Sequence, residues 1–300
     1  MDAPISPDLP SSPARTPAPH PVSRPQVNGM IIKKYIVHLE DHVERKRDFL
    51  SRNTLPGNFI WTAGTKGADL NRLALMESGF LQRNAQINDG SLGNAQSIIR
   101  LLKLSIDNNE IVTILEDDAI LSHHFDPYSL GLLESLSFDF DIVQWGWNFD
   151  SVLYLFPMSP AMGPLEIRAH QDVAQMGFRT FQELACARIL IPLGHQWSSH
   201  CFTVTPHGAG ILLDLLLPLN TDPYFREDLN LRIQPRGLDS MMGKCYPKLK
   251  AYSCFPPLSM TLNDKAKSTI WNKSTHTPRK SAFQRLRHGI QRTFSGMFGI

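Results

Sequence analysis

The sequence predicts an α/β fold with a mostly parallel central sheet and helices on both faces. Short runs rich in β-branched and aromatic residues alternate with longer amphipathic segments, which is the pattern of strands and helices in turn. The chain has 300 residues and is 42% hydrophobic, so a sizeable core is expected. One strand candidate, IVTIL at 111–115, is almost unbroken apolar sequence, which is typical of a strand buried on both faces.

The predicted elements follow one another in the order expected for such a sheet. Helices are predicted at 40–53, which is highly charged, at 91–109 and at 206–219. The helix at 91–109 has a broad buried face, and the helix at 206–219 begins near Pro206, a residue tolerated in a first turn. Strands are predicted at 31–39, 58–64, 111–115, 141–147 and 200–205.

The two ends of the chain differ in composition from the part between them. Residues 1–29 contain eight of the 22 prolines and no apolar run, so we expect them to be disordered. They also lack the basic start and apolar core of a signal peptide. We therefore expect one domain, of the size of an enzyme domain, at 30–262 and a separate basic tail at 263–300.

No segment is long and apolar enough to suggest a membrane span. The best candidate, 211–219, is interrupted by Asp214 and Pro218 and is much shorter than the roughly 18 residues that a span needs. The cysteine spacing matches neither a zinc ribbon nor a thioredoxin-type pair, so we expect reduced thiols in a cytosolic protein. The four cysteines are Cys186, Cys201, Cys245 and Cys254.

Three consecutive acids follow the most hydrophobic strand candidate. Glu116, Asp117 and Asp118 come directly after IVTIL, at the edge where open α/β sheets bind ligands. The period of two along a strand places Glu116 and Asp118 on one side and Asp117 on the other. Two carboxylates on one side suit Mg²⁺ or Mn²⁺, which complete their shells with water and phosphate oxygens. The alternative is that the acids cap the turn that follows.

Six further segments accompany the acidic segment ILEDDAIL in a fixed order. They are YIVHLEDHVERKRDF, FIWTAG, GSLGNAQS, FDIVQWGWN, SSHCFTVTPHGAGILL, and GLDSMM together with KLKAYSCFPPL. With ILEDDAIL, they resemble family 25 glycosyltransferases, the lipooligosaccharide-biosynthesis galactosyltransferases and their collagen-modifying relatives. The resemblance covers most of residues 34–258.

This resemblance implies a Rossmann-like nucleotide-diphosphosugar transferase fold of the GT-A type. It also implies transfer of a sugar, usually galactose, from a UDP-sugar donor with inversion at the anomeric carbon. Glu116 and Asp118 are then expected to hold Mn²⁺ or Mg²⁺ beside the diphosphate. Asp117, Ser97 and Arg45 are expected to contact the donor.

The resemblance also suggests a base and an acceptor. Asp239 in RGLDS matches the late aspartate of the family and is expected to take the acceptor proton or to orient the acceptor. The alternative is that Asp239 caps a turn or helix after Gly237. The expected acceptor is a saccharide, free or lipid-linked, of lipopolysaccharide or lipooligosaccharide.

Three positions depart from the family pattern. His38 stands in place of an Asn, Asn94 in place of a Cys and Ile98 in place of a His. The missing His favours a second hypothesis, a catalytically silent relative that serves as a membrane-associated scaffold. A third hypothesis is a metal-dependent phosphohydrolase, although such enzymes usually group more acid and histidine ligands than this chain does.

Several other side chains could contribute to a site. Trp145 and Trp147 are two apart, so we expect them on one face, where they could stack on a sugar ring or pack at a core edge. His200 or His207 could complete a metal shell, or both could be structural. Arg47, like Arg45, could reach phosphates or be a solvated helix charge.

The tail combines charge with an apolar stripe. Residues 265–300 contain eight Lys and Arg and no acid, while the whole chain has a net charge of +2. Apolar residues recur there at helical intervals, at Phe283, Leu286, Ile290, Phe294 and Met297. This pattern predicts a helix on an anionic membrane surface, or else one folded back on the domain. We expect a cytoplasmic protein, peripheral on the inner membrane face, and no nucleic-acid partner, because no recognition motif accompanies the charge.

Overall fold

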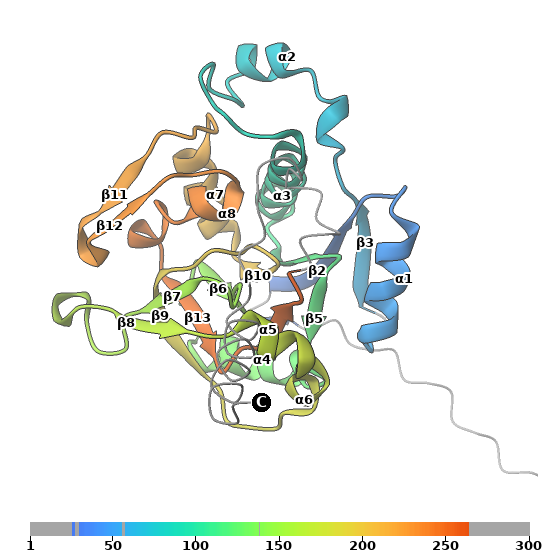
Figure 1. Cartoon of the computed structure of the whole chain (residues 1–300), viewed down its shortest axis with the longest axis vertical. Coiled ribbons are helices and arrows are strands. Elements are labelled where there is room, and N and C mark those ends of the chain that lie inside the picture. Colours follow the sequence, from blue (N-terminus) through green and yellow to red (C-terminus); the bar gives the residue numbers. More distant parts are fainter. Residues whose placement is uncertain (1–25, 28–29, 56–57, 138, 264–300) are drawn as a thin grey trace, which may run out of the picture.

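The structure, a computed structural model, describes residues 26–27, 30–55, 58–137 and 139–263 (Figure 1). The basic tail predicted at 263–300 lies outside these residues except for Asn263, as does most of the predicted disordered segment at 1–29. Within that segment, β1 (Gln26–Val27) pairs with the start of β2 (Met30–His38). Regular structure therefore begins a few residues before the predicted domain start.

A ten-stranded mixed sheet organises the described part of the chain. The strand order is β3-β2-β4-β10-β6-β13-β9-β7-β8, and β1 also pairs with β2. The strands that follow β2 in the chain are β3 (Phe59–Ala63), β4 (Ile111–Glu116), β6 (Ile142–Gln144), β7 (Val152–Leu155), β8 (Leu165–Arg168), β9 (Ile189–His195), β10 (Cys201–Val204) and β13 (Ala251–Phe255).

Strand direction confirms the α/β class and shows a mixed sheet, in which parallel pairing is found within β3-β2-β4 and between β6 and β13. β2, β3 and β4 are parallel, and β6 is parallel to β13. β10 lies between these groups and is antiparallel to both β4 and β6. β3, β2, β4, β6 and β13 therefore share one direction. Beyond them β9 and β8 run the opposite way, whereas β7 again shares the direction of β4.

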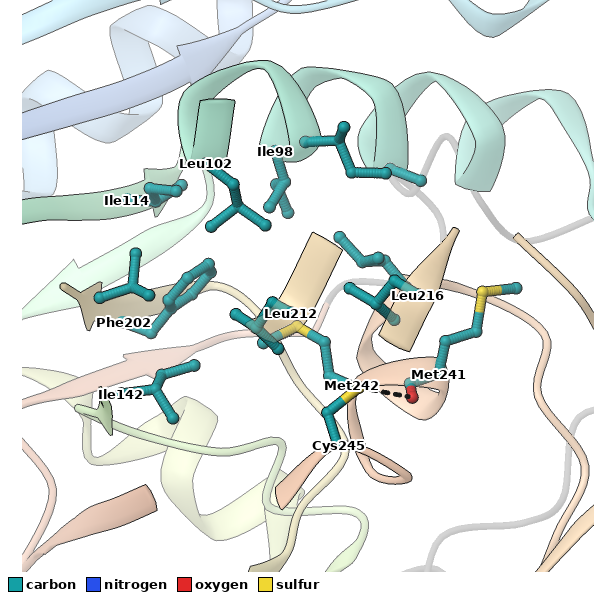
Figure 2. Packing of buried hydrophobic residues seen from close by; sticks show 14 of the residues in the cluster. Ile98, Leu102, Ile114, Ile142, Phe202, Leu212, Leu216, Met241, Met242 and Cys245 are labelled. Atoms are coloured by element: carbon teal, nitrogen blue, oxygen red, sulfur yellow. Dashed lines mark hydrogen bonds between the residues drawn. The ribbon is translucent and has the colours of Figure 1, made fainter. Parts of the chain in front are cut away.

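Helices cover both faces of the sheet, as predicted. On one face α3 (Asp89–Asn108), α7 (Pro206–Leu216) and α8 (Leu238–Met242) pack on strand residues in a cluster that we call the α3 core. Figure 2 shows Ile98 and Leu102 of α3 above Ile114 of β4 in this core. On the other face α1 (Val43–Arg52) and α4 (Phe125–Ser135) pack in the α1 core. β4 contributes Ile114 to the first core and Leu115 to the second, because successive strand residues point to opposite faces.

Every strand and helix predicted from the sequence is present, with shifted ends. α3 begins two residues earlier than predicted because the Asn88 side chain accepts a hydrogen bond from the Ser91 N–H at 2.8 Å and caps the helix. α7 begins at Pro206 as predicted, and Thr205 caps it by accepting from the Gly208 N–H at 3.0 Å. Both helix starts therefore depend on a capping side chain just before the apolar face.

Short elements that the sequence analysis did not predict complete the fold. β5 (Ala119–Leu121) pairs with β14 (Ser259–Thr261), and β11 (Tyr224–Arg226) pairs with β12 (Leu231–Ile233). The remaining helices are α2 (Arg72–Glu77), α5 (Gln171–Met176) and α6 (Phe178–Glu183), with 3₁₀ turns at Gly67–Asp69, Pro160–Met162, Glu227–Leu229 and Tyr246–Lys248. Among the described helices, none combines the length and apolar character needed to cross a membrane.

Gly146 follows β6 and lies against Ser259 of β14. We expect Gly146→Ala to destabilise the protein. An added Cβ would lie 1.8 Å from the Ser259 carbonyl oxygen and 3.0 Å from His200 Nε2. The backbone there is held, because the Trp145 carbonyl accepts hydrogen bonds from the N–H groups of Leu258 at 2.8 Å and Ser259 at 3.0 Å. Overpacking of this kind costs about 1–3 kcal/mol, measurable by denaturant unfolding.

Gly210→Ala in α7 is the matched control. An added Cβ at Gly210 would meet nothing within 4 Å, and alanine favours a helix over glycine by about 1 kcal/mol. We therefore expect Gly210→Ala to leave stability unchanged or to raise it. Equal stability of the two variants would show that the close approach at Gly146 relaxes without cost.

Candidate functional site

The acidic triplet lies where β2 and β4 end side by side. Val37 of β2 is aligned with Glu116 at the last position of β4, and His38 follows Val37. Asp117 and Asp118 form the turn between β4 and β5. The triplet is thus at the carboxyl edge of the parallel strands, as predicted, and helices from both faces reach this edge.

Asp117 is fully paired on the α1 side of the sheet. Its Oδ2 atom lies 2.8 Å from Nδ1 of His38, and its Oδ1 atom is in direct contact with the guanidinium of Arg45. Arg45 comes from the first turn of α1, and both His38 and Asp117 are buried. A buried carboxylate is tolerated only when such partners compensate it. The positive charge that compensates Asp117 is therefore that of Arg45, and donor contact by Asp117 remains a prediction.

Glu116 faces the α3 side and is held by neutral donors. Ser199, just before β10, donates its hydroxyl to Glu116 Oε1 at 2.8 Å, and the Asn94 side chain of α3 also hydrogen-bonds the carboxylate. Burial, followed by the charge of Asp118, raises the pKa of Glu116 to about 7, against the lowering effect of these hydrogen bonds. Glu116 is therefore a carboxylate whose negative charge is only partly compensated.

Asp118 lies in the turn after β4, near the same guanidinium as Asp117. Its side chain is 45% exposed, yet its Oδ1 atom is enclosed and has no hydrogen-bond partner, while Oδ2 is 3.6 Å from the Arg45 guanidinium. Burial raises the pKa of Asp118, and the charge of Arg45 opposes this shift. Asp117 therefore has a partner on each oxygen, one of them a guanidinium, whereas the hydrogen-bond donors to Glu116 are uncharged and Asp118 Oδ1 has no hydrogen-bond partner.

The two incompletely compensated acids fit a hard divalent cation. An enclosed carboxylate oxygen without a partner and a carboxylate with a raised pKa are both stabilised by a nearby positive charge. In the described part of the chain no group of three or more His, Cys, Asp or Glu side chains is placed to hold a metal ion. Mg²⁺ and Mn²⁺ often use one or two carboxylates, with water and phosphate as the other ligands. Glu116 and Asp118 could supply those two.

Ser97 lies in a structural contact between α3 and the segment after β3. Its hydroxyl donates to the Gly93 carbonyl and accepts from the Thr65 N–H, both at 2.7 Å, and it is buried. The contact is close because Gly93 and Gly67 have no side chains. A Cβ on Gly93 would lie 2.3 Å from the Thr65 carbonyl oxygen, and one on Gly67 would lie 1.7 Å from that of Asp89. Donor contact by Ser97 remains a prediction, and in this structure its hydroxyl already has two partners.

Asp239 lies near the amino-terminal half of α3. It is in the first turn of α8, where its Oδ1 atom accepts from the Ser240 N–H at 2.7 Å. The neighbouring Gly237 lies against Ser91 in the first turn of α3. Burial raises the pKa of Asp239, which suits a group that must take up a proton. The predicted capping contact is thus present, and a role as base remains a prediction.

The two tryptophans do not share a face, contrary to the sequence prediction. Trp145 packs in the α1 core and donates its Nε1–H to Thr203 Oγ1 at 2.8 Å, whereas Trp147 packs in the α3 core. Both are almost fully buried, so the alternative of core packing is correct. The strand alternation does not extend to these two residues because β6 ends at Gln144.

The two histidines lie at opposite ends of β10. His200 is beside the acids, since its carbonyl accepts from the Glu116 N–H at 2.9 Å, and its Nδ1 atom contacts Ser198 Oγ. Its Nε2 atom is buried without a hydrogen-bond partner, and burial lowers the pKa of His200 to about 4. His207 follows the far end of β10, where its Nδ1 atom lies 2.7 Å from Asp141. The antiparallel direction of β10 therefore separates His207 from the acids.

The sequence analysis missed three polar partners of the triplet. His38 and Asn94 entered it only as departures from the family pattern, yet they contact Asp117 and Glu116 respectively. No local sequence pattern marks Ser199 as a site residue, because its contact with Glu116 arises from the pairing of β10 with β4. Ile98, the third departure, is buried in the α3 core. Arg47 is exposed and pairs only with Glu44 in the described structure, as a solvated helix charge does.

Comparison with known proteins does not assign a family. No family model matches the sequence, and no curated protein matches it.

Proposed function

We propose that the chain is an inverting glycosyltransferase that requires a divalent cation and moves a sugar from a UDP-sugar to a saccharide acceptor. Galactose is the expected sugar, and lipopolysaccharide or lipooligosaccharide is the expected acceptor, as the family resemblance implies. The observation that supports this proposal is the division of the acidic triplet. Asp117 is neutralised from within the protein, while Glu116 and Asp118 are left beside each other at the sheet edge.

A bound Mn²⁺ or Mg²⁺ would neutralise charge on the departing diphosphate. Glu116 and Asp118 would hold the cation, and Ser199 and Asn94 would keep Glu116 oriented by their hydrogen bonds. Arg45 is the neighbouring positive group, 3.6 Å from Asp118 Oδ2, and would be available to phosphate oxygens. Asp239 would accept the proton of the attacking hydroxyl.

One observation favours a second candidate, a catalytically silent relative. Arg45 contacts both Asp117 and Asp118, so a guanidinium already occupies part of the space beside the acids. Purified protein incubated with a panel of UDP-sugars and Mn²⁺ separates the two candidates. An active transferase releases UDP in a donor-dependent way that chelator abolishes, and a silent relative releases none.

We expect Asp118→Ala to abolish transfer and to leave the fold intact. The side chain lies in a turn, is partly exposed and contributes little packing, whereas the proposed cation depends on it. Transfer and thermal unfolding should be measured together, with Asp172→Ala on the exposed side of α5 as the control. Glu116→Ala should be less severe. Full activity of Asp118→Ala, or activity that is indifferent to chelator, would return the triplet to a capping role.

Glu116→Gln should change the pH dependence of stability in the cation-free protein. The pKa of Glu116 is about 7 in the folded state and 4.5 in the reference state, so the folded state holds the proton more tightly. This contribution is fully present below pH 4.5 and is lost as pH rises through 7. Denaturant unfolding should show wild type losing up to about 3 kcal/mol relative to Glu116→Gln over this range.

Mn²⁺ provides the control for that measurement. Above pH 7 a cation held by Glu116 should restore the stability of wild type and have much less effect on Glu116→Gln. Parallel stability curves for the two proteins, with and without Mn²⁺, would contradict both the raised pKa and the cation site.

Asp239→Asn tests the base. The amide oxygen can still accept from the Ser240 N–H, but the side chain can no longer take up a proton. We expect turnover to fall by about two to four orders of magnitude with UDP binding nearly unchanged. Loss of UDP binding, measured by titration calorimetry, would instead assign Asp239 to the donor site.

A further inference from the structure

Ser91, in the first turn of α3, carries a buried hydroxyl group that the fold does not use. Its side chain is 1% exposed, and its Oγ atom has no hydrogen-bond partner among the described residues. The helix start does not need this hydroxyl, because the Asn88 side chain already accepts from the Ser91 N–H. The buried hydroxyls of Ser97 and Ser105 in the same helix each donate to a carbonyl group. A buried hydroxyl without a partner in the protein costs free energy, which a bound ligand would recover.

Gly237 separates this hydroxyl from the candidate base. A Cβ added to Gly237 would lie 3.6 Å from Ser91 Oγ and 3.2 Å from Asp239 Oδ1. The backbone does not require glycine there, because φ is −153°, an extended conformation that any residue adopts, and the three atoms nearest to the added Cβ all belong to side chains. A side chain at this position would stand between the hydroxyl and the carboxylate, and glycine keeps the position open.

The helix α3 connects Ser91 to the acidic triplet. Ser91 and Asn94 are three residues apart, so they lie on one face of the helix with their Cβ atoms about 5–6 Å apart. Asn94 hydrogen-bonds Glu116, whereas Ser91 adjoins Gly237 at the start of α8. Side chains of α3 and α8 meet in the α3 core, which fixes the two helices relative to each other (Figure 2). The unpaired hydroxyl is therefore one helical turn from a residue that holds a proposed cation ligand.

We propose that Ser91 and Asp239 together bind the hydroxyl groups of the saccharide acceptor. A serine hydroxyl both donates and accepts hydrogen bonds and a carboxylate accepts them, so a ligand hydroxyl can satisfy either group. An anionic ligand such as phosphate would instead be repelled by the Asp239 carboxylate. This inference rests on the proposed function, in which Asp239 is the base.

In the proposed step, Ser91 determines which hydroxyl of the acceptor faces Asp239. The oxygen of that hydroxyl forms the new bond to the anomeric carbon as the bond from this carbon to the UDP oxygen breaks. The proton goes to Asp239, and UDP leaves with the electron pair. Ser91 hydrogen-bonds a neighbouring hydroxyl of the same sugar and is therefore an acceptor-binding residue.

The test compares Ser91→Ala with Ser105→Ala in the full-length chain. UDP-galactose with Mn²⁺ is the donor, and methyl β-galactoside, methyl β-glucoside and lactose are the acceptor probes. Loss of one hydrogen bond to a neutral hydroxyl should raise the acceptor KM of Ser91→Ala about three- to tenfold, while the donor KM changes by less than about twofold. Ser105→Ala removes an equally buried hydroxyl from the same helix, and both KM values should match those of wild type.

Thermal unfolding separates a binding role of Ser91 from a structural one. Ser91→Ala removes a hydroxyl without a partner, so its melting temperature should equal or exceed that of wild type. Ser105→Ala loses a hydrogen bond of 2.6 Å to the Glu110 carbonyl, so its melting temperature should fall. A lower melting temperature for Ser91→Ala would show that the hydroxyl serves the fold, and would overturn the proposal.

Gly237→Ala is a second variant that leaves the Ser91 hydroxyl in place. Its methyl group would stand beside Ser91 Oγ, so the acceptor KM should again rise while the protein stays folded. The proposal is overturned if both variants keep the acceptor KM of wild type, if donor and acceptor KM rise alike, or if wild type releases UDP but uses none of the saccharide probes. No UDP release by wild type with any UDP-sugar would remove the proposed function, and this inference with it.

Discussion

The carboxyl end of β4 presents the constraint on which the site depends: three adjacent carboxylates leave a buried strand together. Their repulsion and desolvation must be offset, and the structure does this unequally on its two faces. On the α1 face, Arg45 and His38 pair with Asp117. On the α3 face, Glu116 receives only neutral donors. Glu116 therefore has hydrogen-bond donors that carry no charge, whereas Asp117 is paired with a guanidinium.

Each partner of the triplet comes from a different element, so the fold is what brings the site together. Arg45 belongs to α1, His38 to β2, Asn94 to α3 and Ser199 to the segment before β10. The elements approach closely at positions that admit only glycine. Gly93 and Gly67 let the start of α3 lie against the chain after β3, and Gly146 lets β14 lie against the end of β6. The geometry at the acids therefore depends on backbone contacts that carry no charge.

The sequence predicts the local parts of this structure and not the long-range ones. Hydrophobic periodicity finds β2, β4, α3 and α7, because each has a period that its own residues display. The direction of β10 depends on which strands flank it, and the separation of Trp145 from Trp147 depends on where β6 ends, so neither is visible in a local pattern. The site residues divide in the same way, into those with a local sequence pattern and those placed by long-range contacts.

Glu116 to Asp118 can be found in the sequence because they are acids directly after a buried strand. Arg45 can be found because it is a cation in the first helical turn after β2. Asn94 and Ser199 are ordinary polar residues until the fold places them beside Glu116. The α/β class was accessible from the sequence. The antiparallel directions of β10, β9 and β8 were not, because direction depends on which strands become neighbours in the fold.

The central claim is that Glu116 and Asp118 hold a divalent cation, whereas the Arg45 guanidinium compensates the charge of Asp117 in place of a metal ion. Anomalous scattering from manganese, in crystals grown with Mn²⁺ and UDP, tests this claim most directly. The account predicts one strong peak within bonding distance of Glu116 and Asp118, with Arg45 still paired to Asp117. A peak bonded to Asp117, or UDP bound with no manganese at this edge, would contradict it.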